Sequence, residues 1–185
     1  GRTIKCALVG CGSQGDRLRN AAARGLDKGM IQWVAVCDIW DYSRRKIAGA
    51  MKGESRHQVD GAVKVYEDIQ EMLDKEPSIE AVFIATPDFL HAPHSRLCLE
   101  KGKAVYCEKM MSNTIEGARD MVKAQKQTGR IFQIGHQRHS NPRYMHLREN
   151  VIKKGMLGRV THCYGQWNRG VSASQPLGAV KGYDI

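Results

Sequence analysis

Residues 4–15 read IKCALVGCGSQG, in which an apolar run leads directly into a loop with the spacing Gly-x-Gly-x-x-Gly. After a strand, the first glycine permits a tight turn, the second lets the backbone approach a phosphate, and the third lets the next helix pack closely. The N–H groups at the start of that helix then face the anion. Taken alone, the pattern also fits an ordinary glycine-rich turn. The residues expected to hold a pyrophosphate are Gly10, Gly12, Ser13, Gln14 and Gly15.

A second apolar run, residues 31–37, ends at the acidic residue Asp38. A carboxylate about 20 positions after such glycines, at the end of the next strand, can accept hydrogen bonds from the hydroxyls of an adenosine ribose. It would also repel a 2′-phosphate, so Asp38 favours NAD and leaves NADP open. Arg44 and Arg45 can bind a 2′-phosphate, but we expect them on the solvated face of the next helix. The alternative for Asp38 is a helix N-cap or turn residue.

Length and composition favour one well-packed domain. The chain has 185 residues, 42% of them apolar, which is enough for one domain but too few for two of full size. No apolar run reaches the roughly 20 residues of a membrane span, and no signal peptide is recognisable. We expect a cytoplasmic protein without a membrane partner; because the chain starts at Gly1, an exported form stays open. The six cysteines lack metal-ligand spacing and predict buried thiols, with no metal site.

Positive charge is concentrated in the last third of the chain. Residues 121–185 carry 11 Lys and Arg against 2 Asp and Glu, whereas residues 1–120 carry 18 against 17, and the net charge is +10. A nucleic-acid surface is one explanation, but no helix-turn-helix, zinc or RNP signature accompanies these residues. We therefore expect no nucleic-acid partner and assign the charge to an anionic cofactor, an anionic substrate or an acidic partner domain.

Strand-like and helix-like segments alternate along most of the chain. Apolar runs of strand length lie at 4–9, 33–37, 63–65, 81–85, 104–107 and 131–134, and helix-like segments lie at 16–25, 43–53, 66–75, 92–102 and 114–129. None of the runs alternates apolar with polar residues, which indicates a buried parallel sheet. The order predicts a doubly wound parallel α/β fold of the Rossmann type over residues 1–137.

Residues 138–185 have a different pattern. A helix is expected from Pro142 to about Lys154, and the alternating segment 159–168 predicts a strand with one wet face. We interpret this region as the start of an incomplete second α+β domain for substrate binding and oligomerisation. An exposed strand edge invites association, so we expect a homo-oligomer.

Two short loops follow the fourth and fifth predicted strands, where open parallel sheets bind ligands. The first reads Ala-Thr-Pro-Asp-Phe-Leu-His at 85–91, and the second reads Cys-Glu-Lys-Met at 107–110. Lys109 is the candidate catalytic residue, because a partly desolvated lysine at a strand end can take part in proton transfer. Taken alone, Lys109 also fits a solvent-facing charge.

The motifs in this order resemble the Gfo/Idh/MocA family of nicotinamide-dependent oxidoreductases, the relatives of glucose-fructose oxidoreductase and inositol dehydrogenase. The resemblance rests on the glycine loop, Asp38, the segments 85–91 and 108–110, and Gly-His-Gln-Arg at 135–138 followed by Asn141-Pro142; it covers residues 3 to about 168. It implies cofactor contacts by Thr86, Pro87, His91, Glu108, Lys109 and Gln137, and substrate contacts by Lys109 and Arg138. A structural cap of the next helix is the alternative for His91.

The sequence departs from the family pattern in two places. Met110 stands where the family has the cis proline of Glu-Lys-Pro. A cis bond before a residue other than proline costs about 2.5–4 kcal/mol, so a trans bond with a different direction for Lys109 stays open beside the cis bond. The catalytic Asp-x-x-x-His of the family's second domain has no match in these residues.

The resemblance thus implies the cofactor-binding portion of an NAD-dependent oxidoreductase, which transfers a hydride between a sugar or polyol derivative and the nicotinamide. Because the main catalytic base has no match, we expect this chain alone to be inactive. Two alternatives stay open. One is a non-catalytic dinucleotide-binding or sensor module, and the other is an NAD-dependent glycosidase of the same superfamily.

Overall fold

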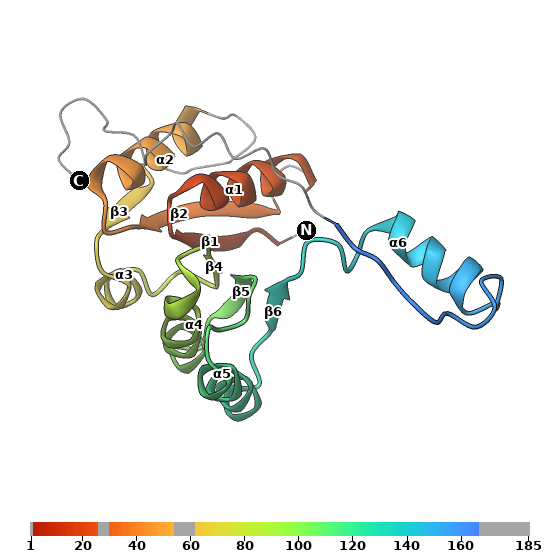
Figure 1. The fold of residues 1–185 in the computed structure, drawn as a ribbon. Coiled ribbons are helices and arrows are strands. Elements are labelled where there is room, and N and C mark those ends of the chain that lie inside the picture. Colours follow the sequence, from red (N-terminus) through yellow and green to blue (C-terminus); the bar gives the residue numbers. More distant parts are fainter. Residues whose placement is uncertain (1, 26–29, 54–61, 167–185) are drawn as a thin grey trace. The chain divides into compact units, whose positions relative to one another are not determined.

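The computed structural model describes residues 2–25, 30–53 and 62–166 (Figure 1). The chain divides into two compact units, Gly1–His136 and Gln137–Ile185. In the first unit strands and helices alternate, as the sequence predicts. Its elements are β1 (Ile4–Val9), α1 (Ser13–Gly25), β2 (Ile31–Cys37), α2 (Asp41–Gly53), β3 (Lys64–Tyr66), α3 (Ile69–Lys75), β4 (Ala81–Ile84), the 3₁₀ turn η1 (Asp88–Leu90), α4 (His91–Glu100), β5 (Ala104–Glu108), α5 (Ile115–Thr128) and β6 (Phe132–Gly135).

The six strands form one parallel sheet in the order β3-β2-β1-β4-β5-β6. The chain therefore winds from β1 toward one edge, returns to the middle at β4, and winds toward the other edge. Val9 at the end of β1 is in register with Cys37 and Ile84, and Ile84 is in register with Cys107. The loops that follow these four strands consequently leave the sheet side by side, at the point where the winding direction changes.

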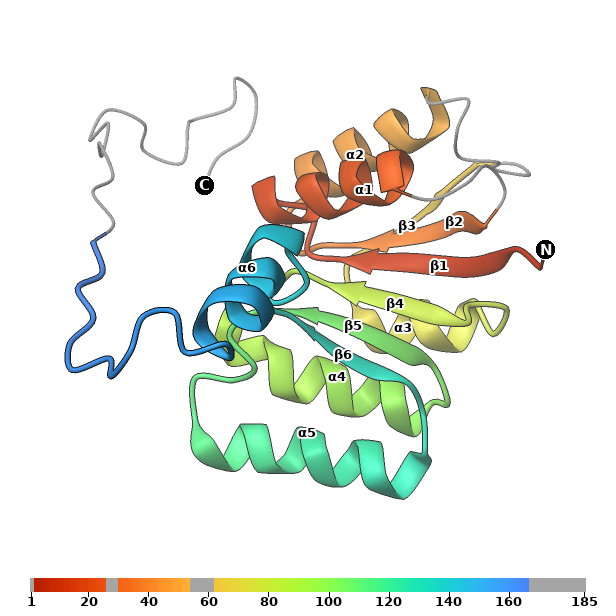
Figure 2. The same ribbon diagram turned by 90° about the vertical axis from the view of Figure 1, so that its right-hand side faces the viewer.

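Helices cover both faces of the sheet (Figure 2): α1 and α2 lie on one face, and α3, α4 and α5 lie on the other. Alternate residues of β1 enter two separate cores. Leu8 packs with Trp33 and with Met51 of α2, whereas Val9 packs with residues of α3, α4 and α5 such as Met121. Because neither face of the central strands is wet, their sequence is continuously apolar.

Side-chain caps set the helix boundaries. Asp68 accepts a hydrogen bond from the N–H of Glu71 at 2.8 Å, so α3 begins at Ile69 and not at 66, where the sequence places it. Thr114 caps α5 through the N–H of Gly117 at 3.1 Å. The same helix ends at Gly129, whose φ of 64° is a left-handed conformation that glycine adopts without a Cβ clash.

The second unit contains α6 (Pro142–Leu147), which continues into a π-helical turn, η2 (Arg148–Ile152). Asn141 caps α6 by accepting a hydrogen bond from the N–H of Arg143 at 2.9 Å. The expected strand at 159–168 is wrong over 159–166, which form no strand, and 167–168 lie outside the described residues. A strand needs a neighbour for its N–H and C=O groups, and no described residue pairs with this segment.

Candidate functional site

The glycine loop after β1 fits tightly against its own backbone. The N–H of Gly10 donates to the carbonyl of Cys37 at 2.8 Å. Gly10 has a φ of 90°, and a Cβ there would lie 2.6 Å from the carbonyl carbon of Ala85. A Cβ at Gly15 would collide with the carbonyl oxygen of Gly10. At Gly12, in contrast, a Cβ would meet nothing within 4 Å among the described residues. Two glycines therefore close the turn, and the middle glycine leaves open space above it.

Asp38 joins the end of β2 to this loop. Its Oδ2 accepts a hydrogen bond from the N–H of Cys11 at 2.6 Å, and its Oδ1 accepts one from the N–H of Trp40 at 2.8 Å. The backbone N–H of Asp38 donates to the carbonyl of Tyr66 at the end of β3. A carboxylate has about four acceptor positions, so Asp38 can accept further hydrogen bonds from ribose hydroxyls while these two hold it in place.

Arg44 on α2 contacts the loop that carries Asp38, and its guanidinium is bonded to four acceptors. Its Nη1 donates to the carbonyl oxygens of Asp38 at 2.8 Å and Ile39 at 3.1 Å. Its Nη2 pairs with the carboxylates of Asp41 at 3.0 Å and Glu67 at 3.3 Å. The side chain is only 13% exposed. The guanidinium thus supports the loop that carries Asp38.

Of the two arginines expected on the solvated face of α2, only Arg45 is there. Arg45 is exposed and pairs with Asp41 at 2.7 Å; its hydrogen bond holds the pKa of Asp41 below its ordinary value. For Arg44 the expectation is wrong, because the carbonyls at the turn before α2 accept hydrogen bonds from its guanidinium and keep it only 13% exposed. The identities of the residues do not indicate which carbonyls this turn presents, so the sequence could not predict these contacts.

The loop after β4 supplies Thr86 and Pro87. Thr86 is half-buried and Pro87 is exposed. The hydroxyl of Thr86 lies 3.4 Å from Nδ1 of His94 on α4. Burial lowers the pKa of His94, the nearby His91 lowers it further, and Asp68 opposes them. His94 is therefore a neutral hydrogen-bonding partner near neutral pH.

His91 lies between two loops. Its side chain is buried, with 1% exposed. Nε2 is 2.8 Å from the carbonyl oxygen of Thr86, and Nδ1 is 2.6 Å from the carbonyl oxygen of Met110. Both ring nitrogens are thus engaged by the backbone. Neither nitrogen is presented to a ligand, and the cofactor contact expected of His91 stays a prediction.

Glu108 ends β5 and is also buried, with 4% exposed. Its Oε1 accepts a hydrogen bond from Nε2 of Gln14 at 2.9 Å, which ties the start of α1 to the end of β5. Its Oε2 accepts one from the N–H of Lys109 at 3.2 Å. The side chain of Lys109 is exposed, and its ammonium forms no ion pair with a residue that the structure describes.

The peptide bond between Lys109 and Met110 is cis. The sequence left the cis and trans forms open at this position. The carbonyl oxygen of Met110 lies 2.6 Å from Nδ1 of His91.

Gln137 and Arg138 belong to the second unit. Both side chains are exposed. Nη1 of Arg138 donates to the hydroxyl of Tyr144 at 2.8 Å, and the guanidinium lies 5.9 Å from the centre of the Tyr144 ring. The structure thus brings together the predicted site residues of the first unit and describes these two separately.

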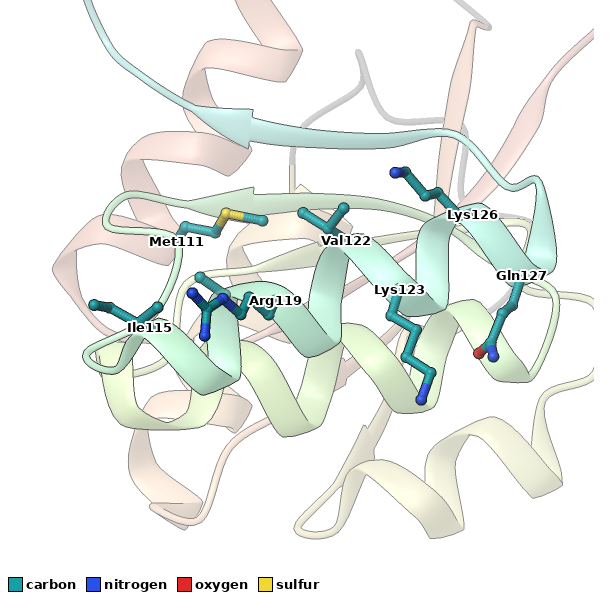
Figure 3. A pocket seen from close by; sticks show the side chains of 8 residues that line it. Met111, Ile115, Arg119, Val122, Lys123, Lys126 and Gln127 are labelled. Atoms are coloured by element: carbon teal, nitrogen blue, oxygen red, sulfur yellow. The ribbon is translucent and has the colours of Figure 1, made fainter.

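A groove of about 650 Å³ lies elsewhere, along the outer face of α5 (Figure 3). Its side chains come from successive turns of α5 and from Met111 in the loop between β5 and α5. Apolar and basic residues line it: Met111, Ile115, Ala118, Arg119, Val122, Lys123, Lys126 and Gln127. No residue of the candidate site contributes to this groove.

Among the described residues, the cysteines and carboxylates form no second candidate site, either nucleophilic or metal-binding. Five cysteines are buried and Cys163 is exposed. Burial raises the pKa of Cys6, Cys37, Cys98 and Cys107 to about 12, so these thiols are not nucleophiles near neutral pH. Residues 2–25, 30–53 and 62–166 contain no cluster of three metal-ligating side chains.

No helix in that part of the chain has the length and apolar character needed to traverse a bilayer.

A dinucleotide fits this donor and acceptor set. The open space at Gly12 and the first N–H groups of α1, which lack acceptors within a helix, suit a pyrophosphate. Asp38 and Glu108 supply acceptors for two riboses. Sequence reasoning identified these residues singly but missed the contact between Gln14 and Glu108 and the anchoring of Arg44. Those contacts join residues 94 and 23 positions apart, and no local pattern marks them.

The Gfo/Idh/MocA family model, an oxidoreductase family with an NAD-binding Rossmann fold, matches residues 4–136. Inositol 2-dehydrogenase 2 of Saccharopolyspora erythraea is 28% identical over 159 residues, which cover 85% of this chain and 43% of that protein. Inositol 2-dehydrogenase of Rubrobacter xylanophilus is 34% identical over 107 residues, 57% of this chain and 30% of that protein. The chain thus spans less than half the length of these relatives.

Solved structures agree with the fold. The scyllo-inositol dehydrogenase from Lactobacillus casei, with bound cofactor NAD(H) and scyllo-inositol, superposes with a TM-score of 0.70 at 25% identity. The match covers 86% of this chain and 44% of that one. Since the family model covers the whole sheet and every strand-end loop of the candidate site, the chain belongs to the Gfo/Idh/MocA oxidoreductase family.

Proposed function

We propose that this chain binds NAD(H) and forms the cofactor half of a dehydrogenase that oxidises a polyol or sugar derivative. One observation carries the proposal: the ends of four neighbouring strands, β2, β1, β4 and β5, bring the glycine loop, Asp38, Thr86 and Glu108 to the same edge of the sheet. The set is linked internally by the hydrogen bonds from Cys11 to Asp38 and from Gln14 to Glu108.

Each group has a distinct role in binding. The glycine loop and the start of α1 hold the pyrophosphate, with Ser13 and Gln14 in the first turn. Asp38 accepts from the adenosine ribose. Glu108 accepts from the ribose next to the nicotinamide, and Thr86 and Pro87 form the wall of that end of the site. Gln137 is proposed to lie beside the nicotinamide.

Lys109 is proposed to take part in proton transfer to or from the substrate hydroxyl. When bound, the nicotinamide exchanges a hydride with the substrate carbon. The exposed ammonium of Lys109 can then donate a hydrogen bond to the substrate hydroxyl and to the carboxamide, and Arg138 contacts the substrate. The Asp-x-x-x-His base of the family has no match in this sequence, so we expect the chain alone to bind cofactor with little turnover.

NAD is the preferred cofactor. Asp38 places negative charge where NADP carries its 2′-phosphate, and such charges repel each other. Arg44 is the nearest cation, but its guanidinium is committed to two carbonyls and two carboxylates. The 2′-phosphate of NADP would therefore face the Asp38 carboxylate, and Arg44 would not be free to neutralise the phosphate charge.

The polyol substrate rests on the relatives. Several of them are named inositol 2-dehydrogenases, and one solved neighbour contains scyllo-inositol. A hydroxyl-rich ring suits the exposed Lys109, because an ammonium donates hydrogen bonds to hydroxyl oxygens.

Self-association is also proposed. The strand that suggested it is absent over 159–166, but the second unit exposes apolar side chains that invite burial. They include Tyr144, Met145, Leu147, Ile152 and Leu157, each more than 40% exposed. Light scattering at micromolar concentration should give a mass above 20.7 kDa; a single monomeric species would contradict this.

The test of cofactor binding is a titration with NADH and NADPH, followed by quenching of tryptophan fluorescence. Trp40 is a suitable reporter because its backbone N–H is bonded to Asp38. We expect saturable quenching by NADH, weaker quenching by NADPH, and loss of the NADH signal in Asp38→Ala. Asp74→Ala, a change at an exposed carboxylate on α3, is the matched control and should titrate like the wild type. Equal titrations of Asp38→Ala and the control would contradict the proposal.

A further inference from the structure

A buried carboxylate, Glu76, lies outside the candidate site, directly after α3. The residue is 7% exposed. Its backbone is fixed on both sides, because its N–H donates to the carbonyl of Met72 at 2.9 Å and its own carbonyl accepts from the N–H of Ile79 at 3.1 Å. Since a carboxylate is costly to bury unless it is paired and hydrogen-bonded, the partners of Glu76 indicate its role.

Two residues of β3 bind the Glu76 carboxylate. Oε1 accepts a hydrogen bond from the Tyr66 hydroxyl at 2.6 Å and pairs with Nζ of the exposed Lys64 at 2.6 Å. Burial and the bond to Glu76 raise the pKa of Tyr66 to about 12, so the hydroxyl keeps its proton near neutral pH. Burial acts to raise the pKa of Glu76, but the hydrogen bonds from Lys64 and Tyr66 together lower it. The tyrosine therefore donates to a charged acceptor, which is a stronger bond than one between neutral groups.

The strand that Glu76 binds is short and lies at the edge of the sheet. β3 has three residues and, among the described strands, pairs only with β2. An edge strand has ladder hydrogen bonds on one side only. With so few of these bonds, the position of β3 also depends on its side-chain contacts.

The end of β3 supports the residue that is proposed to accept the adenosine ribose. The carbonyl of Tyr66 accepts a hydrogen bond from the N–H of Asp38 at 3.1 Å. The next residue, Glu67, pairs with Arg44 at 3.3 Å, and Arg44 donates to the carbonyl of Asp38 at 2.8 Å. Tyr66 thus contacts Glu76 through its side chain and Asp38 through its backbone.

We propose that Glu76 is a positioning residue, which binds Tyr66, fixes the end of β3 and thereby sets where the Asp38 carboxylate lies. Because that carboxylate accepts from the ribose and repels a 2′-phosphate, its position affects the choice between NADH and NADPH. The inference rests on the proposed function for this effect on the nucleotides. The link from Glu76 to Asp38 is a property of the chain without ligand.

The first test is therefore made without nucleotide. In chain labelled with ¹⁵N, the amide signal of Asp38 reports on its bond to Tyr66, and exchange of this amide with deuterium reports how often the bond opens. Tyr66→Phe keeps the ring and removes only the hydroxyl. We expect its Asp38 amide to shift and to exchange at least about threefold faster than in the wild type. An Asp38 amide with wild-type shift and exchange in Tyr66→Phe would overturn the proposal.

Variants at Glu76 show whether the hydroxyl acts through this carboxylate. Glu76→Leu removes the acceptor and should change the Asp38 amide as Tyr66→Phe does. The double variant should change it no further, because both substitutions remove the same contact. Glu76→Gln retains an oxygen that can accept from the tyrosine hydroxyl and should keep the wild-type signal. Additive effects in the double variant would contradict the pathway from Glu76 through Tyr66.

Two control variants separate positioning from other effects. Lys64→Met removes the ion pair but not the tyrosine hydroxyl. Cys98→Ala, a buried change on α4, should lower thermal stability through lost packing. We expect the Asp38 amide shift to be that of the wild type in both. A shift in Cys98→Ala as large as that in Tyr66→Phe would assign the effect to stability and overturn the proposal.

Titrations with NADH and NADPH, followed by tryptophan quenching, test the effect on the nucleotides. In Tyr66→Phe and Glu76→Leu, the ratio of NADH affinity to NADPH affinity should fall about threefold, whereas Glu76→Gln and both controls should keep the wild-type ratio. If both nucleotides bind and the ratio is unchanged in Tyr66→Phe, the proposal is overturned. If the Asp38 amide responds as expected but the wild type binds neither nucleotide, the positioning of Asp38 stands and the cofactor proposal fails.

Discussion

The two halves of the candidate site are built differently. At the adenosine end, both oxygens of the Asp38 carboxylate accept backbone N–H groups, and Arg44 below it contacts four acceptors. At the nicotinamide end, Glu108 is buried and bonded, but the ammonium of Lys109 is exposed and, among the described residues, makes no ion pair. The first half is fixed before ligand arrives, whereas the second half retains one free charge.

This difference separates binding from chemistry. Groups already held by the backbone lose little entropy when a ligand binds, so they favour affinity. A proton-handling group must instead remain able to reach a substrate atom and change partners. Substitutions in the first half should therefore change cofactor affinity, and those in the second half should change turnover.

The largest effect is expected within the glycine loop. A Cβ at Gly15 would overlap the carbonyl oxygen of Gly10, whereas a Cβ at Gly12 meets no described atom within 4 Å. Gly15→Ala should lower the free energy of unfolding by about 3 kcal/mol or more, because backbone must move. Gly12→Ala should unfold like the wild type but lose NADH affinity more than about tenfold, since the added methyl enters the phosphate space.

Chemical denaturation with urea and the NADH titration together check this pair. Equal stability of the two variants would show that the loop is looser than the structure describes. Wild-type affinity in Gly12→Ala would place the phosphates elsewhere.

The next effect concerns the choice between NADH and NADPH. Asp38→Ser removes the repelling carboxylate and should weaken NADH about tenfold, as expected for loss of hydrogen bonds to a charged group. The same change should strengthen NADPH. Adding Glu67→Gln removes one carboxylate partner of Arg44 and should raise NADPH affinity further. Parallel fluorescence titrations with the two nucleotides check this, and an unchanged ratio of affinities would contradict the role given to Asp38.

Lys109→Met should hardly affect cofactor binding. Because an exposed ammonium contributes little affinity through one hydrogen bond to the carboxamide, NADH affinity should change less than about threefold. In a longer protein that includes this chain and turns over substrate, the rate constant should fall by about 10² to 10⁴ if Lys109 transfers a proton. Lys75→Met, at an exposed lysine of α3, is the control. Equal loss of NADH affinity and turnover would assign Lys109 to binding.

The smallest effect is a pH dependence from His94. Its pKa in the folded chain is below the ordinary 6.5, chiefly because of burial. The unfolded chain then binds the proton more readily, so the stability linked to this group is present above about pH 6.5 and is lost as the pH falls through the folded value. His94→Gln should therefore lose less stability than the wild type between about pH 7.5 and pH 5.5. Thermal melts at both pH values check this, and identical losses would contradict it.

Most of the fold could be predicted because the central strands lie in largely apolar runs and most helices between the strands end near a glycine or a cap. The segment 159–168 misled for a physical reason: alternation shows that a segment suits a strand, but a strand also needs a neighbour. In the site, the glycine loop and Asp38 were accessible from spacing alone. The anchoring of Arg44 and the contacts of His91 with two carbonyls were not, because both use backbone carbonyls that every residue possesses.

The most direct test of the account is a ¹⁵N-resolved NMR titration of the chain with NAD⁺. We expect the amide signals of Gly12, Asp38, Thr86 and Lys109 to shift together with a single affinity, since the four loops meet at one edge of the sheet. The amides of the groove residues on α5 itself (Figure 3) should stay unchanged. Shifts confined to the α5 groove, or none at the strand ends, would contradict a dinucleotide site at the carboxyl edge of the sheet.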